Sequence, residues 1–425
     1  MPVGMMIWLA CCGVVGLVWA SRQFAVVRAI RHDRRLRPDS HGPLGKDAPR
    51  LSVLVSAKDE EDNIEACIES LLRQDYPNLE IIAINDRSDD RTGEILDQMQ
   101  RKRGDLVQAV HVSRLTEGWF GKNHAMHTGM KYATGEWLCF IDADCKQTSD
   151  KTLSMAMQEA LSRQADFLSV LPVLETKTFW ERLIQPICAA ILVIWFDPEK
   201  VNNPKCKAAY ANGAFMMMSR KAYQKIGGHT AVKTELNEDI CMARLAKDGG
   251  LKLFVIQNDG LYLTRMYASF KEAWRGWSRI FFGTFRTYRR LFATLGLVLS
   301  MSVFPFISLI VAITGLMLAD EAARSHWWIA LGVTGAVVLM LEIVIFQFMR
   351  LVRAANWAWI TYFFGVLLGV GMLVMAIRKA AGASTTWRGT TYQSDQSTKP
   401  ADQPDVALSE SPMGGVVESR PVTDA

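Results

Sequence analysis

Uncharged apolar runs stand near both ends of the chain, and a region with the mixed pattern of a globular domain lies between them. The first run, Met1–Ser21, has no charged side chain and is long enough to cross a hydrocarbon core of about 30 Å. Three further runs follow the central region, at Leu291–Ala319, Trp327–Phe348 and Trp357–Ile377. We therefore expect one membrane span before the central domain and three after it, the longest tilted or broken at Pro305.

Basic residues beside these runs predict how the spans are oriented. An arginine-rich stretch directly follows the first run; its members are Arg22, Arg28, Arg31, Arg34, Arg35 and Arg37. Lys and Arg concentrate on the cytoplasmic side of membrane segments and attract anionic lipid head groups, although a solvated linker can have the same composition. The loop Arg350–Asn356 is also basic, so we expect the central domain in the cytosol, at the inner (plasma) membrane, and the N-terminus and Asp320–His326 outside. Arg378 and Lys379 oppose a last outward crossing, which leaves the side of the C-terminal tail open.

Short apolar strands alternate with helical patterns in the centre of the chain. The expected strands are Leu51–Ser56, Glu80–Asn85, Gln108–Val112 and Trp137–Ile141. The expected helices between them are Ile64–Arg73, Thr92–Arg103 and Asn123–Tyr132. This alternation predicts an α/β fold with a parallel sheet, in which ligands bind beyond the carboxyl ends of the strands.

Charged side chains follow three of these strands, where ligands are expected to bind. They are Lys58, Asp59 and Glu60 after the first strand, Asp86 after the second, and Asp142 and Asp144 after the fourth. Each acid alone is explained as well by a helix cap, but three groups at three strand ends predict one shared crevice. Asp142 and Asp144 can reach a divalent cation and the ribose of a nucleotide, and Mg²⁺ and Mn²⁺ prefer such oxygen ligands.

Lys122 lies in the sequence Gly121-Lys122-Asn123, which opens the third expected helix. A lysine beside the positive end of a helix suits a phosphate group. The chain contains no GxxxxGK[ST] sequence, which disfavours an ordinary ATPase.

Composition and charge narrow the classes of protein further. The chain has 425 residues, of which 21% are charged, so it is neither wholly membrane-embedded nor limited to one simple domain. Its net charge of +5 arises from basic residues beside the apolar runs, so nucleic acid is not an expected partner. The eight cysteines show no metal-binding spacing, which argues against zinc and fits free thiols in a reducing cytosol.

The ordered motifs of the central region resemble those of membrane-bound family 2 glycosyltransferases with the GT-A fold. The matching segments are SVLVSAKDEEDNI, DYPNLEIIAINDRSDDRT, GKNHA, FIDAD, Asn212-Gly213-Ala214 and Asn237-Glu238-Asp239. This resemblance implies a Rossmann-like nucleotide-sugar-binding domain with flanking transmembrane helices. It also implies a nucleotide-diphosphate sugar donor, UDP-linked, and a divalent cation, Mn²⁺ or Mg²⁺.

The resemblance implies a role for each matching residue. The residues expected at the nucleobase and ribose are Lys58, Asp59, Glu60 and Asp86, with Asp59 in place of the family's usual Asn. Lys122 would line the nucleotide pocket, and Asp142 and Asp144 would hold the ribose and the metal-bound diphosphate. Asp239, next to Glu238, would be the general base that takes the proton of the acceptor hydroxyl. The alternative for this acidic pair is an ordinary helix N-terminus.

The segment Ser269–Arg290 departs from the pattern of processive synthases in this family. Those enzymes carry Gln-x-x-Arg-Trp; here Trp277 matches the Trp, but Ala273 and Gly276 replace the Gln and Arg. The segment resembles more the lipid-acceptor branch, which includes ceramide glucosyltransferases and hopanoid-associated and carotenoid-acid glycosyltransferases. Its mixture of basic and aromatic residues is typical of a helix lying in the lipid head groups, or of a plain juxtamembrane anchor.

Contacts with the diphosphate or the acceptor are expected from Gly213, Arg275, Trp277 and Arg279. The apolar stretch Trp180–Phe196 is interrupted by Pro186; it would form either the acceptor entrance or part of the core.

These patterns together divide the chain into six parts. The expected parts are a transmembrane anchor (1–21), a basic cytosolic linker (22–48), the GT-A domain (49–268), an amphipathic interfacial segment (269–290), three transmembrane helices (291–379) and a disordered tail (380–425). The expected function is inverting, metal-dependent transfer of a single sugar to a membrane lipid. A processive polysaccharide synthase and a non-catalytic sugar-nucleotide-binding scaffold are the alternatives.

Overall fold

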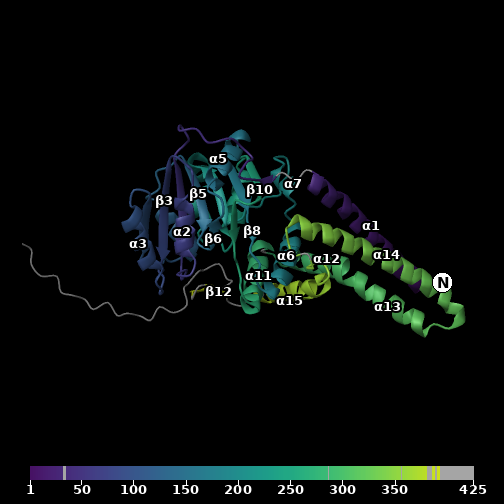
Figure 1. The fold of residues 1–425 in the computed structure, drawn as a ribbon. Helices are drawn as coiled ribbons and strands as arrows, with labels where there is room; N and C mark the ends of the chain where they lie inside the picture. Colours follow the sequence, from purple (N-terminus) through teal and green to yellow (C-terminus); the bar gives the residue numbers. More distant parts are fainter. Residues whose placement is uncertain (32–34, 286, 356, 381–384, 388–389, 393–425) are drawn as a thin grey trace, which may run out of the picture.

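The computed structural model describes residues 1–31, 35–285, 287–355, 357–380, 385–387 and 390–392. A sheet domain and a group of long helices lie side by side, and shorter helices fill the region between them (Figure 1). The predicted residues Arg34 and Asn356, and the predicted tail beyond Tyr392, lie outside the described residues.

An eight-stranded sheet forms the centre of the first part, in the order β1-β10-β7-β9-β5-β2-β3-β4. Its strands are β1 (Arg35–Leu36), β2 (Leu51–Ala57), β3 (Leu79–Asp86), β4 (Val107–Val112), β5 (Trp137–Asp142), β7 (Phe167–Leu171), β9 (Phe215–Ser219) and β10 (Leu253–Asn258). β2 is buried along almost its whole length because both faces of a central parallel strand are covered. The α/β class is confirmed, and the four predicted strands, β2 to β5, pair in parallel. The whole sheet is mixed, because β9, which was not predicted, runs antiparallel to β5 and β7.

Helices cover both faces of this sheet. One apolar cluster joins it to α2 (Ile64–Leu72), α3 (Thr92–Arg103) and α5 (Thr152–Ser162). The cluster on the other face includes α4 (Gly121–Gly129), α8 (Arg220–Lys225) and α10 (Glu238–Asp248). In α2 the buried Ile64, Cys67, Ile68 and Leu71 recur at the spacing of one helix face, which explains why this segment is a helix on the sheet.

Smaller elements complete the sheet domain. β6 (Cys145–Gln147), β11 (Tyr262–Thr264) and β8 (Val173–Leu174) form a three-stranded sheet beyond the end of β5. The short helices α7 (Pro198–Asn202) and α9 (Gly228–Ala231) lie in the connections.

In the part of the chain that the structure describes, four helical segments are long and apolar enough to span a membrane. They are α1 (Val3–Arg31), the segment Tyr288–Leu318, α14 (Glu321–Leu351) and α15 (Tyr362–Ala380). Trp8 contacts Trp327 and Gly16 contacts Val337, so α1 and α14 run in the same direction. The N-terminus and the turn before α14 therefore lie together at the end of the bundle farthest from the sheet (Figure 1).

Three predicted boundaries differ from the structure. α1 continues past Ser21 to Arg31, and β1 joins the main sheet, so the expected linker 22–48 is partly regular structure. The run from Leu291 is divided into α12 (Tyr288–Val298), a π-helical segment (Leu299–Val303) and α13 (Phe304–Leu318). The break falls where expected, since Pro305 opens α13. Within the expected disordered tail, β12 (Thr385–Trp387) and β13 (Thr390–Tyr392) pair as a hairpin.

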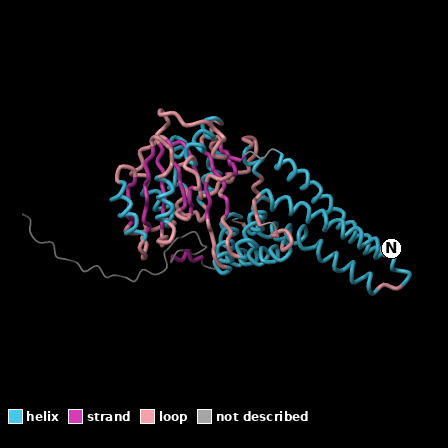
Figure 2. The backbone as a smooth tube through the Cα atoms, viewed as in Figure 1, coloured by secondary structure: helices cyan, strands magenta, loops and turns pink. Residues whose placement is uncertain are grey.

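A third apolar cluster joins the two parts of the molecule. It contains α6 (Phe179–Val193), α11 (Phe270–Phe285) and α15. The glycines Gly365 and Gly371 let α15 approach α6 and the Trp274 ring of α11 closely. Trp277, Phe281 and Phe285 of α11, in the segment that we predicted to be interfacial, are buried in this cluster. Figure 2 shows these helices as a compact group directly beneath the strands.

Candidate active site

One cavity of about 1000 Å³ lies between the strand ends and the helices α6, α10, α11 and α14. Every residue predicted for the site lines it: Lys58, Asp59, Glu60, Asp86, Lys122, Asp142, Asp144, Gly213, Glu238, Asp239, Arg275, Trp277 and Arg279. The topology explains this convergence, because β2, β3 and β5 are parallel neighbours and end at the same edge of the sheet.

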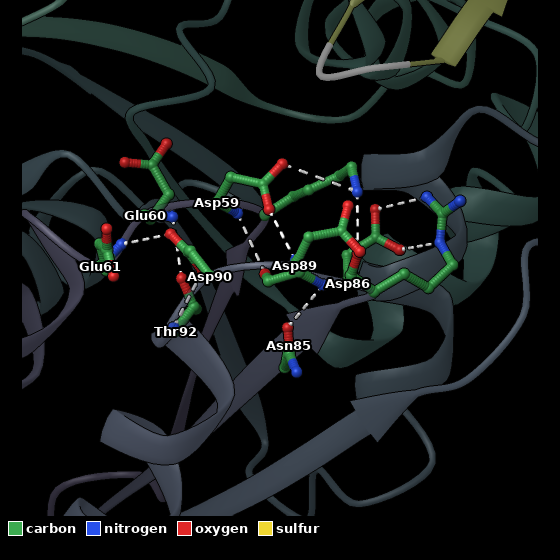
Figure 3. A network of polar contacts seen from close by, with 11 residues as sticks. Asp59, Glu60, Glu61, Asn85, Asp86, Asp89, Asp90 and Thr92 are labelled. Atoms are coloured by element: carbon green, nitrogen blue, oxygen red, sulfur yellow. Dashed lines mark hydrogen bonds and ion pairs between the residues drawn. The ribbon is translucent and has the colours of Figure 1, made fainter.

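The turns after β2 and β3 are linked into one polar rim of the cavity (Figure 3). Lys58 Nζ donates to the carbonyl of Arg87 at 2.8 Å, and the Asp59 amide donates to Ser88 Oγ at 3.0 Å. Asp59 Oδ1 in turn accepts from the Asp89 amide at 2.9 Å. Asp59 and Arg87 both have a positive φ, of 54° and 56°, which these contacts hold in place. The Asp59 carboxylate therefore shapes the rim itself.

Glu60 and Asp86 complete this rim. Glu60 Oε2 accepts from Asn63, and its amide donates to Thr92 Oγ1 at 2.9 Å. Asp86 is 2% exposed, and the Arg87 guanidinium donates hydrogen bonds to both of its carboxylate oxygens, at 2.8 and 3.1 Å. Sequence reasoning missed Arg87, for which the only signal was its place directly after an acid at a strand end.

Lys122 connects two acidic motifs that are far apart in the sequence. Its Nζ lies 2.6 Å from Asp142 Oδ1 and 2.6 Å from Glu238 Oε1. Burial acts to lower the pKa of Lys122, but these two carboxylates raise it well above its ordinary value. The lysine is thus held in its charged form between the end of β5 and the start of α10.

The carboxylates near Asp144 leave negative charge that Lys122 does not balance. Burial, then the charges of Asp142 and Glu60, raise the pKa of Asp144 to about 7. Among the described residues no group of three or more His, Cys, Asp or Glu side chains is arranged to hold a metal ion. Two carboxylates with excess negative charge still fit Mg²⁺ or Mn²⁺, since such ions commonly take one or two protein carboxylates and complete their shell with substrate phosphates and water.

Asp239 lies at the start of α10, with its carboxylate held by two backbone amides. Gly213 donates to Oδ2 at 2.9 Å and Ile240 to Oδ1 at 2.7 Å. Burial and the neighbouring Glu238 raise the pKa of Asp239 to about 7, a value suited to a base near neutral pH. A Cβ on Gly213 would lie 3.1 Å from Lys122 Nζ, so a larger residue there would crowd the lysine.

The far wall of the cavity is apolar and belongs to the cluster of α6, α11 and α15. The residues that line it are Pro186, Ala189, Leu192 and Val193 of α6 and Trp277 of α11, which is 3% exposed. Arg275 and Arg279 line the cavity one helical turn apart. The Trp180–Phe196 stretch therefore lies in the cavity wall as well as in the core.

Comparison with known proteins agrees with this geometry. Residues 52–227 match the family model described as glycosyl transferase family 2. This part of the chain therefore resembles a family 2 glycosyltransferase domain, as its motifs predicted.

Two curated relatives are 4,4'-diaponeurosporenoate glycosyltransferases of Staphylococcus aureus. The protein of strain USA300 is 26% identical over 232 residues, and that of strain MRSA252 is 25% identical over 231 residues. Each alignment covers 54% of this chain and 60% of the relative, so the chain spans less than two thirds of the relatives' length.

A solved structure shares the fold. It is a mannosyltransferase from Pyrobaculum calidifontis in complex with GDP-Man and Mn²⁺, with a TM-score of 0.51 and 17% sequence identity. The superposition covers 88% of this chain and 99% of the mannosyltransferase. The predicted GT-A-like architecture is thus confirmed.

Proposed function

We propose that this protein transfers one sugar, with inversion, from a nucleotide-diphosphate sugar to a hydroxyl or carboxyl group of a membrane lipid. The observation that carries the proposal is the cavity itself. Its polar end holds Asp142, Asp144 and Asp239, and its other wall is an apolar surface packed against a helix long enough to span a membrane. A water-soluble donor and a lipid acceptor can meet in such a space.

We assign the polar rim of the cavity to the nucleotide of the sugar donor, which we take to be UDP. Lys58, Asp59, Glu60 and Asp86 would surround the nucleobase and ribose. Lys122 would place its positive charge near the diphosphate, and Asp142 and Asp144 would hold Mg²⁺ or Mn²⁺. When bound, the cation would neutralise charge on the departing diphosphate.

Asp239 would act as the general base. An acceptor hydroxyl, or a carboxylic acid that enters in its protonated form, gives its proton to the Asp239 carboxylate as its oxygen bonds to the anomeric carbon. The bond from that carbon to the diphosphate oxygen breaks, and the nucleoside diphosphate leaves. Displacement from the opposite face inverts the anomeric centre. Glu238 supports the reaction by holding Lys122.

The location we propose is the cytosolic face of the inner (plasma) membrane, with α1, the segment Tyr288–Leu318, α14 and α15 as spans. The arginines at the end of α1 and Arg350 at the end of α14 lie at the end of the bundle nearest the sheet domain, which supports this orientation. The proposed division of the chain keeps 49–268 as the GT-A domain and 269–290 as the segment that joins it to the C-terminal helices. The curated relatives, named for a carotenoid acid, support a lipid acceptor.

A measurement of nucleoside-diphosphate release would test the proposal. Detergent-solubilised protein is supplied with UDP- or GDP-sugars, Mn²⁺ or Mg²⁺, and total membrane lipid. We expect lipid-stimulated release from one donor, and loss of that release in Asp239→Asn or Asp144→Asn. Full activity in either folded variant would contradict the assignment. Nucleotide binding without turnover of any donor would favour the scaffold, and a ladder of products would favour a processive synthase.

A further inference from the structure

Two polar side chains are buried in the apolar wall of the cavity without hydrogen-bond partners. Gln185 of α6 is 1% exposed, and neither its amide oxygen nor its amide nitrogen has a partner in the part of the chain that the structure describes. Trp277 of α11 is 3% exposed, and its indole N–H is unpaired among the same residues. Buried polar groups are nearly always paired, so two unpaired groups in one wall call for an explanation.

Their surroundings suggest what would pair with them. Both residues line the cavity that also contains Asp239, and α6 and α11 pack against each other. The other α6 residues that line the cavity include Pro186, Ala189 and Leu192, which have no polar side chain. A glutamine amide has two N–H donors and one acceptor oxygen, and an indole has one donor. A molecule that is mostly apolar and carries one oxygen-bearing head group matches this set.

We propose that Gln185 and Trp277 form a polar subsite that binds the head group of the acceptor lipid and turns it toward Asp239. The inference rests on the proposed function and adds the residues that select the acceptor. The head group is a hydroxyl or carboxyl at the end of an apolar chain, since either can accept from both donors. Gln185 thereby determines which acceptors bind, and the donor site is independent of it.

A second buried glutamine provides a matched control. Gln147 of β6 is 3% exposed, and both of its amide atoms also lack partners among the described residues. It does not line the cavity. A role confined to folding would make the two glutamines behave alike, whereas an acceptor subsite requires them to differ.

The kinetic test compares Gln185→Leu, Trp277→Phe and Gln147→Leu in the full-length, detergent-solubilised protein. We expect Gln185→Leu and Trp277→Phe to raise the KM for the lipid acceptor about tenfold, the scale of one hydrogen bond, and to leave the KM for the sugar donor unchanged. Gln147→Leu should leave both constants unchanged. An unaltered acceptor KM in Gln185→Leu, or an equal rise in Gln147→Leu, would overturn the inference.

Photo-crosslinking tests the subsite without relying on turnover. A long-chain alcohol and the matching carboxylic acid, each with a diazirine next to the head group, are incubated with the wild-type protein and irradiated. We expect peptides of α6 and α11 to be labelled in the wild-type protein and to be labelled less in Gln185→Leu. The probe that gives more labelling, the alcohol or the carboxylic acid, identifies the head group. Absence of labelling there refutes the subsite whether or not the protein transfers sugar. Labelling in a protein that releases no nucleotide would refute the proposed function and leave the subsite standing.

Discussion

Asp239 is the residue whose protonation state the proposed chemistry depends on most. Its pKa is raised to about 7, so it is protonated below that pH and ionised above it. A base must be ionised, and we therefore expect the rate of nucleoside-diphosphate release to rise with pH, with a midpoint near 7. Asp239→Asn removes the base and should lower the rate by about 10²- to 10⁴-fold.

The exposed Asp248 at the other end of α10 provides the control for this prediction. Asp248→Asn should keep the wild-type rate and the wild-type pH profile. A profile that falls as the pH rises through 7 would contradict the assignment of Asp239 as the base.

Glu80, at the start of β3, gives the free energy of unfolding a pH dependence that is separate from the proposed reaction. Burial acts to raise its pKa, but hydrogen bonds from Ser52, Thr134 and Arg50 lower it to about 2. Because the folded-state value lies below the ordinary 4.5, the stabilisation is present above that pH and is lost as the pH falls toward 2.

Glu80→Gln should therefore lower the free energy of unfolding by about 1 to 2 kcal/mol at neutral pH, after allowance for solvent screening. The difference from wild type should shrink in acid. Thermal unfolding at several pH values measures this effect, with the exposed Glu94→Gln as the unaffected control. A difference that does not change with pH would rule out the linkage.

Motif spacing predicted which residues line the cavity, but not their mutual contacts. Lys122, Asp142 and Glu238 come from three motifs, and their ion pairs depend on the register of β5 and the placement of α10. Gln185 was missed because a single glutamine in an apolar helix has no pattern of its own.

Among the helices, the packing of α11 depends on a glycine. A Cβ added to Gly276 would lie 2.1 Å from the Tyr267 ring. Gly276→Ala should therefore destabilise the protein by about 1 to 3 kcal/mol, the usual cost of overpacking a core. The same crowding leaves no room for the arginine that processive synthases carry at this place in their motif.

Thermal unfolding of Gly276→Ala beside Gly296→Ala measures this cost. Gly296 of α12 has open space at its Cβ position, so alanine there should be neutral or slightly stabilising. The double variant with Tyr267→Ala should regain part of the loss. Equal stability of the two alanine variants would contradict the packing argument.

Local patterns predicted the ends of β2 to β5 to within one residue and those of α2 to α4 to within three, because burial and helix spacing decide them within each segment. The two-residue strand β1 was not predicted. The antiparallel strand β9 was not predictable in the same way. It fits between β5 and β7 only through pairings with segments about 50 to 80 residues away in the sequence. For the same reason the position of α6 beside α15 could not be read from its composition.

At the scale of the whole molecule, Asp259, which follows β10, forms ion pairs with residues after β1 and after α14. Arg37 after β1 contacts its Oδ2 at 3.0 Å, and Arg353 after α14 contacts its Oδ1 at 2.5 Å. The side chain of Asp259 is 15% exposed, so these pairs are better shielded than ordinary surface pairs. We expect Asp259→Asn to loosen the attachment of the sheet domain to the helices.

Limited proteolysis measures this attachment. Trypsin should cleave after Arg35 several times faster in Asp259→Asn than in wild type, and high salt should reduce the difference. Asp105→Asn, which affects only a local pair with Arg103, is the control. Identical cleavage rates in all three proteins would show that the ion pairs of Asp259 do not hold the sheet domain to the helices.

The apolar wall of the cavity has a consequence for how the rate depends on the membrane. If the acceptor reaches Asp239 along α6 and α11, it never has to leave the bilayer for water. The quantity that controls turnover is then the number of acceptor molecules per unit area, as for other reactions confined to a surface. Adding inert phospholipid at a constant total amount of acceptor would slow the enzyme, although no concentration in the test tube had fallen.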